Sequence, residues 1–196
     1  MFEVDMFPSR FFIIEDAVKH EELMEVLNTI KKDTDKIASI QSGQNGPTYK
    51  TNYPQAEVHG ILFKPILKHL NNHLAKDNVS FNLIRDPWYA EYGEYDFHEP
   101  HIHTTDFNPD LRYLANTFQY SGLICLSNFG QTSFINPNPS SSTSEIIELP
   151  SKYNRVILFP SNLYHYVIPH GLRDKVRAIF SFNSILKMII QDGNIN

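Results

Sequence analysis

Three of the nine histidines in this 196-residue chain lie within six positions, in the stretch YDFHEPHIHTT at residues 95–105. They are His98, His101 and His103. Side chains alternate between the two faces of a β-strand, so on a strand His101 and His103 point the same way, while Ile102 points the other way. Two imidazoles on one face can bind a single metal ion. The spacing therefore indicates a metal site, although such a pair can also consist of ordinary polar residues on a solvent-exposed strand face.

A metal site needs at least one more ligand from elsewhere in the chain, and His165 in FPSNLYHYVIPHG offers it. Three neutral imidazoles suit Fe, Zn or Cu. Non-haem iron oxygenases commonly use two histidines and one carboxylate instead. The nearest carboxylates are Glu99, on the same expected strand face, and Asp106, beyond the strand. Both ligand sets stay open at this point. His98 and His170 could line the site without touching the metal.

Length, composition and charge favour one intracellular domain over residues 1–196. The chain is 41% hydrophobic and carries a formal net charge of −5, which removes a broad electrostatic attraction to nucleic acid. The single cysteine, Cys125, cannot form an intramolecular disulfide, as suits a reducing compartment. No apolar run is long enough for a membrane helix, and the first residues lack the pattern of a signal peptide. We expect a cytoplasmic protein with no membrane partner.

The expected elements change character near residue 79. Residues 11–14 read as a strand, followed by an amphipathic helix with Asp16 as its N-cap, and a second helix covers about residues 59–76. Residues 41–55 between them are rich in Gly, Pro and Asn and read as a loop.

From residue 79 onward, short runs rich in aromatic and β-branched residues alternate with turn clusters. The eight expected strands are VSFNLI, PWYAEYG, QYSGLICLS, TSFINP, SEIIELP, RVILFP, YHYVIP and VRAIFSFNSIL. This pattern predicts an antiparallel sandwich or jelly roll. The fold class is thus mostly β with N-terminal helices (α+β), with a supporting segment at residues 1–78 and a core at residues 79–190.

The stretches EPHIHTT, SGLICLSN, FINPN and VILFPSNLYHYVIPHGLRDKVRAIFSFN together resemble the 2-oxoglutarate- and Fe(II)-dependent oxygenases. The similarity is to the subgroup with a His-x-His motif, related to prolyl hydroxylases, and it covers roughly residues 48–187. It implies a double-stranded β-helix (jelly roll) and an enzyme that uses Fe(II), 2-oxoglutarate and O2. Carried over, His101 is the first iron ligand and His165 the distal one. His103, which stands where most of the superfamily has Asp or Glu, is the favoured third ligand, with Asp106 or Glu99 as substitutes.

The resemblance also implies a basic residue that holds the distal carboxylate of 2-oxoglutarate. Arg177 stands about where that residue belongs, and a guanidinium can grip a carboxylate with two parallel hydrogen bonds. Related hydroxylases place a tyrosine near the co-substrate, which would be Tyr92 here. Prolyl hydroxylases often have another co-substrate tyrosine where this chain has Cys125, so Ser121 or Tyr92 would supply that hydrogen bond.

The implied reaction is hydroxylation of an unidentified substrate. A prolyl or other peptidyl residue, a free amino acid, a small metabolite and a modified nucleobase all stay open. Residues 103–118 and 136–144 are expected to form a rim or lid that carries specificity. The alternatives are a cupin-like metal protein or three-histidine dioxygenase that needs no 2-oxoglutarate, and hence no Arg177, or a barrel without chemistry.

Overall fold

The computed structural model describes residues 2–5, 10–32, 39–41, 45–50, 54–74, 79–83, 87–103, 117–136 and 145–188. Two helices, α1 (His20–Lys32) and α2 (Gln55–Leu74), accompany thirteen strands in this part of the chain. The strands are β1 (Phe2–Asp5), β2 (Arg10–Ile14), β3 (Ser39–Gln41), β4 (Thr48–Lys50), β5 (Val79–Leu83), β6 (Trp88–Tyr92), β7 (His98–His101), β8 (Thr117–Cys125), β9 (Gln131–Ile135), β10 (Ile146–Pro150), β11 (Val156–Pro160), β12 (His165–Val167) and β13 (Arg177–Met188).

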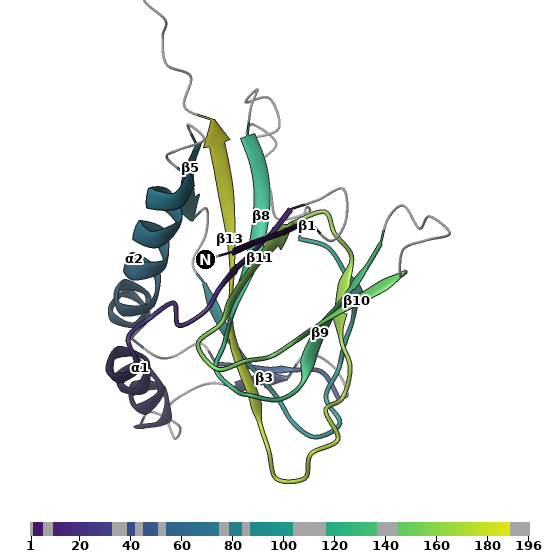
Figure 1. Cartoon of the computed structure of the whole chain (residues 1–196). Helices are drawn as coiled ribbons and strands as arrows, with labels where there is room; N and C mark the ends of the chain where they lie inside the picture. Colours follow the sequence, from purple (N-terminus) through teal and green to yellow (C-terminus); the bar gives the residue numbers. More distant parts are fainter. Residues whose placement is uncertain are drawn as a thin grey trace, which may run out of the picture.

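The described strands form two antiparallel sheets. The larger has the order β1-β2-β11-β8-β13-β6-β4-β3, and β5 pairs with the end of the long strand β13. The smaller has the order β10-β9-β12-β7. The two sheets face each other, and α1 and α2 lie against the other face of the larger sheet (Figure 1). The fold is therefore mostly β with two helices, as expected.

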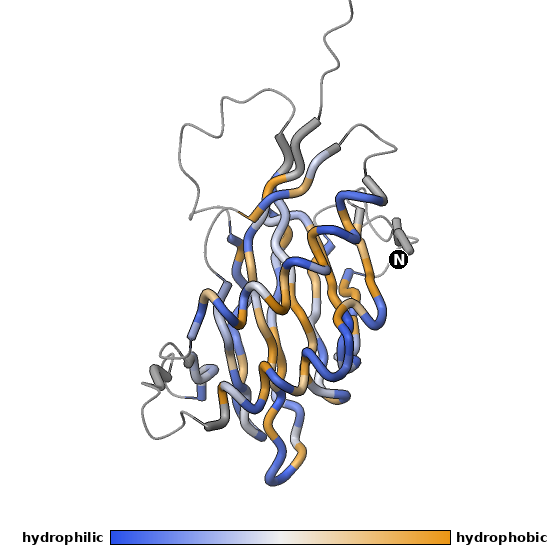
Figure 2. Tube along the Cα trace, turned by 90° about the vertical axis from the view of Figure 1, so that its left-hand side faces the viewer, coloured by the Kyte–Doolittle hydropathy of each residue, from blue (hydrophilic) through white to orange (hydrophobic). Residues whose placement is uncertain are grey.

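The larger sheet is buried on both faces, which explains its nearly continuous apolar strands. On β2, Phe12 and Ile14 pack in the core beneath the helices, whereas Phe11 and Ile13 pack in the core between the sheets. Strands β8 and β11 divide their side chains in the same way, whereas β13 places Phe180 and Phe182 beneath the helices and Ile179 in a third, smaller cluster with Tyr92 and Val167. Figure 2 shows hydrophobic residues recurring along the central strands, while the helices present hydrophilic residues outward. Alternate residues of one strand thus serve two different cores.

The two helices supply the outer layer of the core through the faces that the sequence predicted. Leu23, Val26 and Ile30 of α1 are at most 1% exposed, and Leu62 and Ile66 of α2 are fully buried. In the described part of the chain, neither helix has the length and apolar character needed to cross a lipid bilayer.

The expected N-cap of the first helix is wrong. α1 begins at His20, and Asp16 lies four residues earlier with a positive φ of 50°. Asn154 holds the intervening segment instead: its Oδ1 accepts from the Val18 N–H and its Nδ2 donates to the Val18 carbonyl. Because the tertiary hydrogen bonds fix this segment outside the helix, the helix starts later than its sequence indicates. The second helix spans Gln55–Leu74, shifted from the predicted 59–76.

The eight strands predicted after residue 79 are all present. The expected loop at residues 41–55 is wrong in part, because β3 and β4 pair with each other there and β4 pairs with β6. A polar, Gly- and Pro-rich stretch can still join the edge of a sheet, where ladder partners rather than apolar packing determine its backbone. Residues 104–116 and 137–144, which hold most of the two expected rim loops, lie outside the described part.

Candidate metal centre

Three histidines converge between the two sheets, although 62 positions separate His103 from His165. In the smaller sheet, β7 pairs with β12, and His101 stands directly opposite His165. One possible ligand atom from each of His101, His103 and His165 lies within 4.8 Å of the others. No carboxylate belongs to this group of described residues. The cluster fits a metal site, as the His-x-His spacing predicted.

His103 reaches the cluster by a route that strand alternation does not explain. Strand β7 ends at His101, so the expectation that both histidines share one strand face is wrong. The backbone N–H of His103 instead donates to the carbonyl of Ser161 at 2.9 Å. Its ring Nδ1 donates to Oδ1 of Asn183 at 3.1 Å. Tertiary hydrogen bonds, rather than the strand ladder, position this side chain.

Carbonyl groups fix the tautomers of the other two histidines. Nδ1 of His101 lies 2.8 Å from the carbonyl oxygen of Glu99, and Nδ1 of His165 lies 3.0 Å from that of Leu163. A carbonyl oxygen only accepts, so each Nδ1 carries the ring hydrogen. Each Nε2 therefore keeps a lone pair for a metal ion. This arrangement is typical of metal-binding histidines.

Neither carboxylate that the sequence offered as a third metal ligand, Glu99 or Asp106, belongs to the described metal group. Glu99 is exposed and contributes its backbone carbonyl to His101, while its carboxylate lies outside the metal group. Asp106 lies outside the described residues. Among the described side chains, His103 is the one that completes the group.

Burial favours the neutral form of His98, His101 and His165. It lowers the pKa of His165 well below its ordinary value, and the neighbouring His101 and His103 lower it further. Burial also lowers the pKa of His101, and that of His98 to about 4. Neutral imidazole is the form that binds metal, so the lowered pKa values of His101 and His165 favour metal binding at neutral pH.

A cavity of about 410 Å³ adjoins the three histidines. Trp88 stacks on the ring of His103, with centroids 5.7 Å apart, and the ring of His98 lies 3.9 Å from that of His101. The remaining lining residues include Tyr49, Tyr92, Leu123, Thr132, Phe159, Val167, Ile179 and Ser181. His98 thus lines the site, as expected, and is not part of the three-histidine group.

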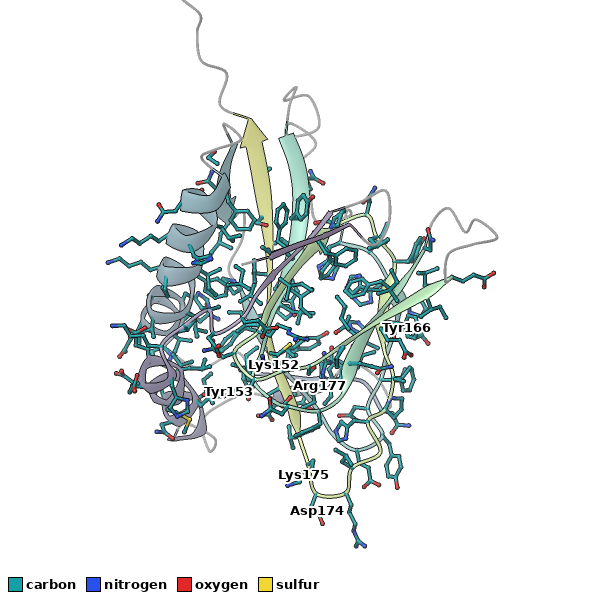
Figure 3. All side chains as sticks on the ribbon, in the orientation of Figure 1. Lys152, Tyr153, Tyr166, Asp174, Lys175 and Arg177 are labelled. Atoms are coloured by element: carbon teal, nitrogen blue, oxygen red, sulfur yellow. The ribbon has the colours of Figure 1, made fainter. Side chains whose placement is uncertain are left out.

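Arg177 lies in the space between the two sheets (Figure 3) and is 1% exposed. Its Nε donates to Oγ of Ser151 at 2.9 Å and its Nη2 to Oγ1 of Thr132 at 2.8 Å. Its Nη1 has no hydrogen-bond partner among the described residues. Burial lowers the pKa of the guanidinium, but an arginine remains charged at neutral pH. A buried cation with an unused donor is a ready site for an anion.

Tyr92 and Ser121, the other predicted co-substrate residues, lie in different surroundings. Tyr92 stands opposite Arg177 in the β6–β13 pairing, and the guanidinium carbon lies 5.1 Å from the centre of its ring. Burial raises the pKa of Tyr92, so its phenol stays protonated and can donate. Ser121 is engaged elsewhere, because its Oγ donates to Oδ1 of Asn183 and lies 2.8 Å from Oγ of Ser161. The buried thiol of Cys125 lies in the core between the sheets.

Gly130, whose role the sequence did not reveal, makes room for Arg177. Its φ is +76°, and a Cβ built there would lie 2.6 Å from Cδ of Arg177. Sequence analysis likewise missed Ser151 and Thr132 as partners of Arg177. Single small residues in turns and strands carry no local signal of such distant contacts.

Comparison by sequence finds no matching family model and no matching curated protein. By structure, the chain is similar to the non-haem α-ketoglutarate-dependent epimerase SnoN from nogalamycin biosynthesis, with 12% identity, a TM-score of 0.65, and coverage of 89% of this chain and 76% of that one. SnoN has also been solved with Fe3+, α-ketoglutarate and nogalamycin RO.

Two prolyl hydroxylases are also similar in structure. The Pseudomonas putida prolyl-4-hydroxylase has 12% identity, a TM-score of 0.56, and coverage of 90% and 91% of the two chains. A Trichoplax adhaerens prolyl hydroxylase in complex with a hypoxia inducible factor peptide fragment has 16% identity, a TM-score of 0.58, and coverage of 91% and 83%. The resemblance seen in the sequence is therefore confirmed at the level of the fold: the chain has the fold of the 2-oxoglutarate- and Fe(II)-dependent oxygenases.

Proposed function

We propose that this protein is an Fe(II)- and 2-oxoglutarate-dependent dioxygenase, and that its two facing sheets are the double-stranded β-helix, or jelly roll, of that class. Arg177 carries the proposal. Among the described residues, its buried guanidinium has an unused Nη1 and only neutral hydroxyl groups as hydrogen-bond partners. Thr132 and Tyr92 beside it both line the cavity of the three histidines. A cupin that binds metal alone has no need of such a buried cation.

The donor set fits the metal. His101, His103 and His165 would hold Fe(II) through Nε2 atoms, and the bound ion would supply O2 activation for the oxidation of a C–H bond. Three neutral imidazoles leave the charge of a divalent ion uncompensated. This charge, together with Arg177, favours a dianionic co-substrate such as 2-oxoglutarate.

The chain's own residues would bind and orient that co-substrate. Arg177 would grip the distal carboxylate, while Ser151 and Thr132 hold the plane of the guanidinium. The protonated phenol of Tyr92 can add a hydrogen bond. Ser121 remains a predicted donor, although its hydroxyl already has two partners. Leu123, Phe159, Val167 and Ile179 give the cavity apolar walls, which exclude water.

The proposed reaction is hydroxylation of a peptidyl residue, prolyl or other, by a cytoplasmic enzyme. The titles of the similar structures name a peptide fragment in one complex and nogalamycin RO in another. A small-molecule substrate is thus the second possibility on this fold.

A three-histidine metal protein that does not use 2-oxoglutarate is the second candidate function. The observation that favours it is the donor set itself, because no carboxylate joins the three histidines among the described residues. On that account Arg177 would be a structural residue, and its replacement would leave ligand binding unchanged.

Calorimetric titration of 2-oxoglutarate into the protein, with and without Co(II), separates the candidates. We expect binding that requires the metal and weakens by at least about 30-fold in Arg177→Met, since removing one partner of a buried charge pair costs about 2–5 kcal/mol. Tight Co(II) binding without 2-oxoglutarate binding would favour the second candidate. Failure to bind either would contradict both.

A further inference from the structure

His103 is the one ligand of the three-histidine group that neither lies on a described strand nor hydrogen-bonds through its ring to a nearby backbone carbonyl. His101 and His165 each donate from Nδ1 to the carbonyl two residues earlier, so local chain geometry sets their tautomers. The ring of His103 donates instead to Asn183, 80 positions away. Asn183 therefore holds the ring of His103 from a distant strand, where His101 and His165 use the carbonyl of a near neighbour in the chain.

Asn183 belongs to a buried polar network that includes Ser121 and Ser161. Its Oδ1 accepts from Nδ1 of His103 at 3.1 Å and from Oγ of Ser121 at 2.8 Å. Oγ of Ser121 lies 2.8 Å from Oγ of Ser161, whose backbone carbonyl accepts from the N–H of His103. Asn183, Ser121 and Ser161 are all at most 1% exposed. The network thus holds His103 by both its backbone and its ring.

The chemistry of the network suits a histidine ligand. A carboxylate at position 103 would need no acceptor behind it, whereas an imidazole that binds metal through Nε2 must place its Nδ1 hydrogen somewhere. Ser121 donates to the same oxygen of Asn183, and two donors on one amide oxygen keep that oxygen turned toward His103. An amide facing the other way would put an N–H against Nδ1 and hold the ring hydrogen on Nε2, which would block the ligand.

We propose that Asn183, supported by Ser121 and Ser161, is the positioning residue that makes His103 a metal ligand by fixing its tautomer and ring orientation. This inference rests on the proposed metal site. It adds that the site is specialised for a third imidazole through a buried amide on β13, the strand that also carries Arg177. One strand would then support both the metal and the co-substrate.

The test compares Co(II) binding by wild type, Asn183→Ala and Asn183→Asp. Loss of an outer hydrogen-bond partner commonly costs about 10- to 100-fold in metal affinity, and we expect a loss in this range for Asn183→Ala. Asn183→Asp keeps an acceptor and should restore most of the affinity. Ser184→Ala is the matched control, because Ser184 is an equally buried polar residue on β13 that donates to the Tyr120 carbonyl. It should bind Co(II) as wild type does.

Proton NMR of the Co(II) forms in water gives a second readout that lost stability would not imitate. Each bound histidine whose Nδ1 hydrogen is held contributes an exchangeable, strongly shifted signal. Wild type and Asn183→Asp should show three such signals and Asn183→Ala should lose one. If Asn183→Ala does not fold, the presence or absence of the third signal in Asn183→Asp still tests whether an acceptor at position 183 holds the Nδ1 hydrogen of His103.

Three results would overturn the inference: unchanged affinity and signals in Asn183→Ala, tighter binding in that variant, or a missing third signal in Asn183→Asp. Absence of Co(II) binding by wild type would instead contradict the proposed function itself.

Discussion

At the scale of single residues, the site combines neutral bases with one buried cation. The lowered pKa values of His98, His101 and His165 mean that these side chains resist protonation in the folded protein. In the unfolded chain, histidine titrates near about pH 6.5. Between the two values the unfolded state binds more protons, so acid favours unfolding there.

The metal-free protein should therefore be fully stable against this effect above about pH 6.5 and lose stability as the pH falls from there toward 4, the pKa of His98 being about 4. Thermal unfolding in the presence of a chelator, from about pH 7 to about pH 4.5, measures it. His98→Gln should flatten the decline, because one depressed group is removed. A melting temperature that rose on acidification would contradict the assignment of buried neutral histidines.

The second prediction at this scale concerns Arg177 without its ligand. Arg177 has no ionic partner in the described part of the chain, so its burial costs desolvation energy. Replacement of such buried charges by apolar residues is often neutral or stabilising. Arg177→Met should thus unfold at a temperature no lower than wild type in the absence of 2-oxoglutarate. Adding 2-oxoglutarate and Co(II) should raise the melting temperature of wild type more than that of the variant. A variant that is destabilised, yet gains as much from 2-oxoglutarate, would assign Arg177 a structural role only.

At the scale of elements, the turn between β8 and β9 shapes the space for Arg177. Gly130→Ala should cost about 1–2 kcal/mol from its positive φ, lowering the melting temperature by roughly 2–8 °C. The added Cβ should also push Arg177 aside and weaken 2-oxoglutarate binding, as calorimetry would detect.

Gly171→Ala is the matched control, because Gly171 has a φ of +66° and no atom within 4 Å of its ideal Cβ. It should lose similar stability and keep 2-oxoglutarate binding. Equal binding by both variants would mean that Gly130 serves only the turn.

Most of the helices and strands could be predicted from the sequence, but some of their boundaries and edge strands could not. Short runs of aromatic and β-branched residues between turn clusters were enough to predict β5, β6 and the strands from β8 to β13. Apolar residues at helical spacing were enough to predict the buried faces of α1 and α2. The start of α1 was predicted wrongly, because hydrogen bonds from Asn154 overrule the local capping signal. The edge strands β3 and β4 were missed, since they contribute few apolar residues. The start of α1 and the pairing of β4 with β6 depend on contacts between segments far apart in the chain, which local patterns do not reveal.

The same limit applies to the site. His101, His103, His165 and Arg177 could be proposed from residue type and motif, because metal and carboxylate binding require particular side chains. Asn183 could be placed on the same strand face as Arg177, but its hydrogen bond to His103 could not be predicted. That contact depends on where the chain goes after β7 ends. The role of Gly130 could not be predicted for a similar reason, because the glycine acts by leaving space for the side chain of Arg177.

At the scale of the whole molecule, the two larger hydrophobic cores support different parts of the protein. The helices cover the outer face of the larger sheet, whereas the core between the sheets adjoins the histidines. Leu62→Ala in α2 and Phe134→Ala in β9 remove fully buried side chains. They should cost about 2–5 and 3–5 kcal/mol, respectively.

Only Phe134→Ala should also change metal affinity, because Phe134 pairs with His165 across the strands and its ring lies 6.0 Å from the imidazole. Urea unfolding and Co(II) titration measure the two effects. Loss of metal affinity in Leu62→Ala at temperatures where it is folded would show that the helices do more than support the sheet.

The central claim is that one cavity brings together a three-histidine metal centre and a carboxylate-binding arginine. The most direct test adds Fe(II) and then 2-oxoglutarate to the anaerobic protein and follows the weak visible charge-transfer band of the chelate. Wild type should develop the band, His165→Ala should not, and Arg177→Ala should need far more 2-oxoglutarate to reach it. Wild-type protein that develops no band after Fe(II) and 2-oxoglutarate are added would contradict the account.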